Sequence, residues 1–178
     1  MEVYSKLPNV GTTIFSVMSA LADEHGAINL SQGFPNFSSP QALTDLVCHY
    51  LQAGYNQYAP MPGLPSLREA IAQKAAHRYG INLNPATEIT ITAGATQAIY
   101  CSIAAFVRPG DEVILLEPAY DCYRPAVEVN GGLPVIYELK APDYKINWQH
   151  VEALLTPATR MIIINTPHNP TGTALQTA

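Results

Sequence analysis

From residue 88 onward, short apolar strands alternate with helices, and this alternation limits the fold more than any other property of the sequence. Parallel strands joined by helices bury both faces of their sheet. An α/β fold with a mainly parallel sheet and helices on both faces is therefore predicted. Hydrophobic periodicity places strands at 88–92, 112–116, 135–139 and 161–165 and helices at 95–107, 119–130 and 148–155, the last capped by Asn147.

Residues 1–87 carry the pattern of amphipathic helices instead. Ser39 is the expected N-cap of one helix, and Ser66 with Glu69 has the spacing of a capping box for another. Gly80 supplies a helix stop, because glycine tolerates the left-handed conformation at a helix end. Three amphipathic helices are predicted, at 14–22, 40–51 and 67–79.

The composition narrows the function classes. A chain of 178 residues has room for about one ordinary domain. Its net charge of −5 offers no basic surface for nucleic acid or for an anionic membrane. Hydrophobic residues make up 48% of the chain, but charged residues make up only 13%, about half the ~25% of a typical domain. Part of the surface is therefore expected to be covered by other protein.

The cysteines and the N-terminus point to a cytoplasmic protein. Cys48, Cys101 and Cys122 form no Cys-x-x-Cys pair, so neither a disulfide framework nor a zinc site is suggested, and each is expected to be a small buried side chain. The first residues, Met1 to Val10, hold no apolar run of the signal-peptide kind.

The carboxyl ends of strands are where α/β folds bind ligands, and the segment after the first expected strand has a glycine turn leading into a helix. The backbone of Ala95 and Thr96 and the Thr96 hydroxyl suit a phosphate at the positive end of the helix dipole. A purely structural strand–glycine–helix turn is at least as common. The segment lacks both the Gly-x-Gly-x-x-Gly fingerprint and a P-loop lysine, which disfavours dinucleotides and nucleoside triphosphates.

Two other strand ends carry unusual residues. Tyr120, after the second strand, has a ring that suits stacking on a planar cofactor, although most of the ten tyrosines must simply pack. The rigid segment 165–172, after the fourth strand, holds Asn169 between two prolines, and the Asn169 amide is suited to donate to a phenolate oxygen.

Together with Ser31-Gln32-Gly33-Phe34-Pro35 and with Tyr55-Asn56-Gln57-Tyr58 before Pro62-Gly63, these strand ends resemble the class I/II aminotransferases of fold type I. These enzymes use pyridoxal 5′-phosphate, and the resemblance, to the methionine and kynurenine aminotransferase branch, spans essentially the whole chain. It implies an incomplete large domain. Residues 1–54 are expected to form the N-terminal arm and part of the small domain, and 55–178 the first part of the large cofactor-binding domain.

The resemblance also implies roles for single residues. Gly33 would let the substrate carboxylate approach the backbone, and Tyr58 would reach the partner subunit's cofactor phosphate in a homodimer. His168 receives no role beyond packing or holding its turn. For the cofactor itself, the implied contacts are Gly94, Ala95 and Thr96 at the phosphate with Gln97 beside them, Tyr120 stacked on the ring, and Asn169 at the phenolic oxygen.

No catalytic residue is expected in this chain, because the family's Schiff-base lysine lies downstream of the Asn-Pro-Thr-Gly motif. Lys6, Lys74, Lys140 and Lys145 do not stand in the family's Ser-x-x-Lys setting. The expected function is transamination of methionine or an aromatic amino acid with a 2-oxo acid. Cysteine-conjugate β-elimination, and an inactive fragment that pairs with a full-length subunit, are the alternatives, whereas a dinucleotide binder rests only on the α/β pattern.

The family's strand order makes one further prediction about the sheet. The strand at 88–92 would adjoin strands that come later in the sequence, beyond residue 178. The other three strands are therefore expected to pair with one another, and 88–92 to be left without its neighbours.

Overall fold

The computed structural model describes residues 4–33 and 35–175, so Phe34 of the Ser31–Pro35 motif lies outside the described residues. The chain forms two compact units. Residues 14–92 are called the helical unit, and residues 4–13 with 93–175 the sheet unit. The units thus divide the chain at residues 13 and 92 rather than at residue 54, and the assignment of 1–54 and 55–178 to family domains stays a prediction.

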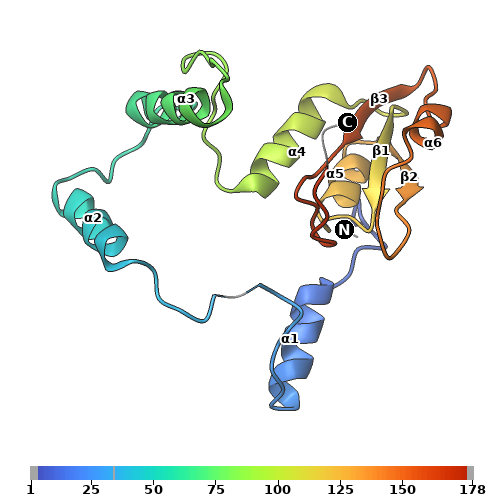
Figure 1. Cartoon of the computed structure of the whole chain (residues 1–178), viewed down its shortest axis with the longest axis horizontal. Helices are drawn as coiled ribbons and strands as arrows, with labels where there is room; N and C mark the ends of the chain where they lie inside the picture. Colours follow the sequence, from blue (N-terminus) through green and yellow to red (C-terminus); the bar gives the residue numbers. More distant parts are fainter. Residues whose placement is uncertain (1–3, 34, 176–178) are drawn as a thin grey trace. The chain divides into compact units, whose positions relative to one another are not determined.

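The sheet unit is built on three parallel strands (Figure 1). The strand order is β2-β1-β3, and Ile114 in the central strand lies opposite Val135 on one side and Ile162 on the other. The α/β class and the parallel sheet are confirmed. The elements in chain order are α4 (Ala95–Phe106), β1 (Glu112–Glu117), α5 (Tyr123–Val129), β2 (Leu133–Glu138), α6 (Trp148–Ala153) and β3 (Thr159–Ile163).

Strand β1 sends alternate side chains into two cores, one on each face of the sheet, as the pleat of a strand requires. Val113 and Leu115 pack against α4 and α5 in the first core, which also contains Ile103, Val107, Tyr123, Ala126 and Val127. On the opposite face, Ile114 and Leu116 pack with Leu139 and are covered by the segment that follows β2, through Tyr144, Ile146 and Leu154. All four β1 residues are buried, so β1 anchors the unit.

The helical unit contains α1 (Ile14–Glu24), α2 (Gln41–Gln52) and α3 (Pro65–Tyr79). Gly80 ends α3 in the left-handed conformation at φ 68°, which confirms the predicted stop. The predicted capping box of Ser66 and Glu69 is wrong, because α3 begins earlier, with Pro65 in its first turn and no side-chain cap. Proline suits that position, since it has no N–H to leave unpaired and its φ is already helical.

Other helix starts also differ from the sequence pattern. Pro40, not Ser39, is the N-cap of α2, and no side chain bonds to the helix start there. The helix expected from residue 119 begins only at Tyr123, after a turn, whereas the Asn147 cap of α6 is confirmed by bonds from the N–H groups of Gln149 and His150.

Residues 88–92 form no strand, which corrects the prediction from their alternating pattern. Ile89 is buried, and the Ile91 N–H donates to the Pro62 carbonyl at 3.0 Å, so the segment is held within the helical unit by loop contacts. A strand exists only when another strand accepts its ladder of hydrogen bonds. The described sheet consists of β1, β2 and β3, and none of them pairs with residues 88–92. This agrees with the expectation that 88–92 is left without its neighbouring strands.

The apolar faces of α1 and α2 are exposed. Neither helix has a buried residue among those described, and Val17 in α1 and Leu46 in α2 are 48% and 52% exposed. These apolar side chains occupy surface that charged residues cover in a typical domain, in line with the low charged fraction. In the part of the chain that the structure covers, every helix is too short or too polar to cross a membrane.

Candidate cofactor site

The first turn of α4 has the features of an anion-binding helix start. Gly94 precedes it with φ 87° and ψ 167°, a conformation that only glycine adopts readily, and this turn directs the chain into the helix. The first N–H groups of an α-helix have no acceptor within the helix, and the helix dipole adds positive charge there. Ala95 and Thr96 are exposed, so these groups are open to an anionic ligand.

Gln97 closes the turn from inside the helix. Its side-chain oxygen accepts a hydrogen bond from the Ala93 N–H at 2.5 Å. The bond uses the oxygen of the side chain, so the amide nitrogen of Gln97 is the group that it has to offer a ligand. Gln97 therefore first stabilises the glycine turn.

Tyr120 lies at the carboxyl end of β1 and is half-buried. Its ring makes an edge contact with the ring of Tyr123, with 6.0 Å between centroids and 72° between planes. The Tyr123 N–H donates to the Tyr120 carbonyl at 3.2 Å, so a single turn fixes both residues. Tyr120 also packs on the core that α4 and α5 share, as does Ile99 of α4. A flat aromatic side chain is thus held close to the helix that begins after Gly94.

Cys122 and Thr96 connect the segment after β1 with the start of α4. They line one apolar groove of about 330 Å³, together with Leu7 and Tyr100. Burial raises the pKa of the Cys122 thiol and the Asp121 carboxylate adds to the rise, while hydrogen bonds from its own N–H and from Thr96 act in the other direction. The thiol is therefore protonated at neutral pH and behaves as a packing group.

The other two cysteines differ from expectation. Cys48 and Cys101 are exposed, on α2 and α4, and all three thiols are free. The expectation that each would be buried is wrong for these two, because a cysteine is buried only where another element covers its helix face.

His168 holds the turn after β3. It is buried, its Nδ1 lies 2.8 Å from the Thr171 hydroxyl, and its N–H donates to the Thr173 carbonyl at 2.8 Å. The Gly172 N–H in turn donates to the His168 carbonyl at 2.7 Å. The expectation of a packing, turn-holding histidine is confirmed. Asn169, next to it, is exposed, so the turn presents the Asn169 amide at the surface.

A link between two strand ends was not predicted from the sequence. Burial raises the pKa of Tyr123, the neighbouring Cys122 adds to the rise, and a hydrogen bond from the Asn165 side chain opposes it. Asn165 follows β3, whereas Tyr123 follows β1. Only the sheet order brings the two together, so no local pattern signals the contact.

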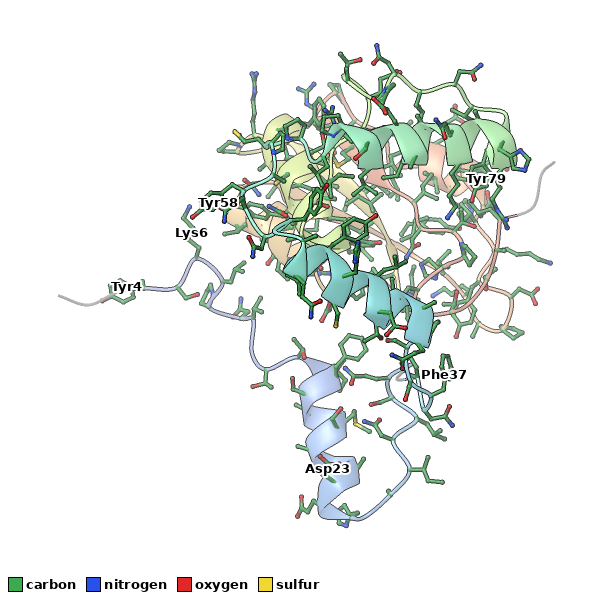
Figure 2. The ribbon with its side chains drawn as sticks, turned by 90° about the vertical axis from the view of Figure 1, so that its left-hand side faces the viewer. Tyr4, Lys6, Asp23, Phe37, Tyr58 and Tyr79 are labelled. Carbon is green, nitrogen blue, oxygen red and sulfur yellow. The ribbon has the colours of Figure 1, made fainter. Side chains whose placement is uncertain are left out.

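Gly33 and Tyr58 belong to the helical unit. A side chain at Gly33 would meet open space, and the Tyr58 side chain is fully exposed on the loop between α2 and α3 (Figure 2). Their roles toward substrate and partner cofactor stay predictions. Lys140 and Lys145 are engaged in exposed ion pairs with Glu138 and Asp143.

The sheet unit thus combines groups that fit a phosphorylated aromatic cofactor. The turn at Gly94 leaves helix N–H groups open to a phosphate, and the half-buried ring of Tyr120 after β1 offers a stacking surface. The amide of Asn169 lies at the surface after β3. A phosphate and a pyridine ring on one molecule match these groups in chemistry.

Comparisons with known proteins point to one family. The family model for aminotransferase class I and II matches residues 25–178. The methionine aminotransferase of Escherichia coli is 52% identical over 174 residues, which is 98% of this chain and 45% of that protein. The kynurenine–oxoglutarate transaminase of Dictyostelium discoideum is 35% identical over 91% of this chain and 41% of its own length. The chain therefore spans less than half the length of the relatives it matches.

Solved structures agree in fold. One is the crystal structure of YbdL from Escherichia coli, for which a methionine aminotransferase function was identified. It matches with a TM-score of 0.95 at 51% identity, and the match covers 99% of this chain and 46% of the YbdL chain. The structure of N-succinyldiaminopimelate aminotransferase from Mycobacterium tuberculosis matches with a TM-score of 0.92 at 40% identity, and the match covers 98% of this chain and 46% of that chain. These neighbours are fold type I enzymes. The chain belongs to the family of class I and II aminotransferases.

Proposed function

We propose that this chain supplies the pyridoxal 5′-phosphate site of an aminotransferase that acts on methionine or a similar amino acid with a 2-oxo acid. The observation that carries the proposal is the pairing, within one compact unit, of an exposed helix start behind Gly94 with the half-buried ring of Tyr120. When bound, the cofactor supplies an electron-withdrawing ring on which an amino group can be exchanged between amino acid and oxo acid.

The residues of the first turn of α4 bind the phosphate in this account. The backbone N–H groups of Ala95 and Thr96 donate to its oxygens, and the Thr96 hydroxyl adds a further bond. Gly94 makes this approach possible, because its φ of 87° directs the chain into the helix with no side chain in the way. Hydrogen bonds to a charged group contribute about 1.5–3 kcal/mol each, so the phosphate provides much of the affinity.

Tyr120 and Asn169 orient the cofactor ring. Tyr120 covers one face of the ring, an offset contact worth about 0.5–1.5 kcal/mol beyond the area it buries. The exposed Asn169 amide donates to the phenolic oxygen, and a bond of this kind contributes about 1 kcal/mol. Asn169 therefore adjusts the position and electronic state of the ring, whereas the phosphate contacts hold the molecule.

Substrate and assembly follow from the relatives. The 52% identity to a methionine aminotransferase supports methionine as amino donor, with Gly33 at the substrate carboxylate. A homodimer in which Tyr58 reaches the partner's cofactor phosphate accounts for the full exposure of that side chain. The free thiols of the described residues support a location in the cytoplasm.

Binding of pyridoxamine 5′-phosphate, measured by calorimetry, tests the site directly. This probe has no aldehyde, so it does not react with exposed lysines. Thr96→Ala removes one bond to a charged phosphate and is expected to weaken binding about tenfold. Ser102→Ala is the matched control, since it removes a hydroxyl from the same helix away from its start. The Ser102 hydroxyl donates to the Ala98 carbonyl. Equal affinity for Thr96→Ala and Ser102→Ala would exclude the Thr96 hydroxyl as a ligand of the phosphate.

A further inference from the structure

Tyr123 is a buried aromatic residue to which the cofactor contacts assign no task. It is the first residue of α5, and it is 9% exposed. Its ring lies in the core between α4, α5 and β1, with Val113, Leu115 and Val127. A side chain enclosed in this way has few rotamers open to it, so it is a rigid support for whatever touches it.

The residue that it supports is Tyr120. The two rings meet edge to face, with 6.0 Å between their centroids and 72° between their planes, and this is a favoured geometry for an aromatic pair. The backbone bond from the Tyr123 N–H to the Tyr120 carbonyl, 3.2 Å, fixes the spacing of the two residues. Because Tyr120 is only half-buried, the contact with Tyr123 restricts its tilt from the protein side.

The end of the neighbouring strand also acts on Tyr123. Asn165 lies two residues after the end of β3, and its side chain opposes the rise in the pKa of Tyr123 that burial causes. Asn165 also lines a small pocket with Leu116 and His168, the residue that holds the turn before Asn169. Tyr123 thus contacts Tyr120 after β1, and its surroundings include Asn165 after β3.

We propose that Tyr123 is a positioning residue that sets the tilt of the Tyr120 ring against the cofactor ring. The inference rests on the proposed function, because it takes Tyr120 as the residue that covers the cofactor. It assigns Tyr123 no contact with the cofactor itself. Its effect is therefore on affinity for the ring, and the phosphate contacts of α4 are independent of it.

The test compares two probes on the full 178-residue chain, pyridoxamine 5′-phosphate and inorganic phosphate. Tyr123→Leu removes the ring contact and is expected to weaken pyridoxamine 5′-phosphate about tenfold while leaving inorganic phosphate unchanged. Tyr123→Phe keeps the ring and loses the hydroxyl, so its affinity should stay within about threefold of the original. Val127→Ala, a fully buried change in the same core, controls for lost stability and should change neither affinity.

Each other outcome has a defined meaning. If Tyr123→Leu binds pyridoxamine 5′-phosphate as the unchanged chain does, while Tyr120→Leu weakens it, the positioning role is wrong and the cofactor site stands. An equal loss for both probes, or an equal loss in Val127→Ala, shows a merely structural role and also overturns the proposal. If the unchanged chain binds neither probe, or Tyr120→Leu has no effect, the proposed function fails at Tyr120 or at the site as a whole, and the inference fails with it.

Discussion

Replacing Gly94 by alanine tests the backbone conformation on which the phosphate site depends. The conformation of Gly94, φ 87° and ψ 167°, lies in a region that is almost exclusive to glycine, where another residue costs about 1–3 kcal/mol. A Cβ built at Gly94 meets no atom within 4 Å, so the expected penalty is backbone strain and not a clash. Alanine also restricts the unfolded chain, which offsets about 0.4–1 kcal/mol. The middle of these two ranges gives a net loss of about 1.3 kcal/mol in the free energy of unfolding.

Gly11→Ala provides the matched control. Gly11 also belongs to the sheet unit and has open space around it, but its φ lies outside the left-handed region. Alanine there is expected to leave stability unchanged or to raise it by a few tenths of a kcal/mol. Urea unfolding followed by circular dichroism measures both variants. If Gly94→Ala is as stable as Gly11→Ala and binds phosphate equally well, the strained turn is not what forms the site.

Three further changes test the fold around the site. Gly132→Ala would place a Cβ 2.6 Å from a Val107 methyl and is expected to lower the midpoint of urea unfolding. Adding Val107→Ala to this variant should restore part of the loss, and strictly additive effects of the two changes would contradict the packing. Asn147→Ala removes the N-cap of α6 and should cost about 1 kcal/mol in urea unfolding, against no change if the cap were unimportant. A hydrogen bond from the Arg108 N–H lowers the pKa of Asp111 below its ordinary 3.8; burial opposes this shift and Arg160 adds to it. The ionised Asp111 therefore stabilises the fold above pH 3.8, and this contribution is lost as the pH falls through the lower pKa of the folded chain. Unfolding measured from pH 7 to pH 2 should accordingly lose less stability in Asp111→Asn than in the unchanged chain, and parallel curves would refute the role of Asp111.

The sequence predicts best those features that depend on neighbours in the chain. Helical periodicity located all six described helices, although the one that starts at Tyr123 was expected four residues earlier. Gly80 and Asn147 were predicted correctly, because a left-handed stop and a side-chain cap are local chemistry. Pro65 shows the limit of such rules, since two acceptable helix starts two residues apart, after Leu64 and after Ser66, compete at that end of α3.

Features that depend on distant elements were predicted less well. Residues 88–92 have the alternation of a strand but form none, because alternation says nothing about whether a partner strand is present. The exposure of Cys48 and Cys101 has the same origin, since burial depends on what covers a helix face. At the site, Gly94 and Tyr120 could be singled out from their places after expected strands. The approach of Asn165 to Tyr123 arises only when β1 and β3 lie side by side.

In the proposed function, the start of α4 and the segment after β1 form one cofactor site. Two-dimensional ¹H–¹⁵N NMR of the chain, titrated with pyridoxamine 5′-phosphate and separately with inorganic phosphate, measures this residue by residue. Both probes are expected to shift the amide signals of Ala95 and Thr96, and only the ring-bearing probe should also shift those of Tyr120 and Asn169. Shifts confined to other segments, or the same shifts with both probes at Tyr120, would contradict the account.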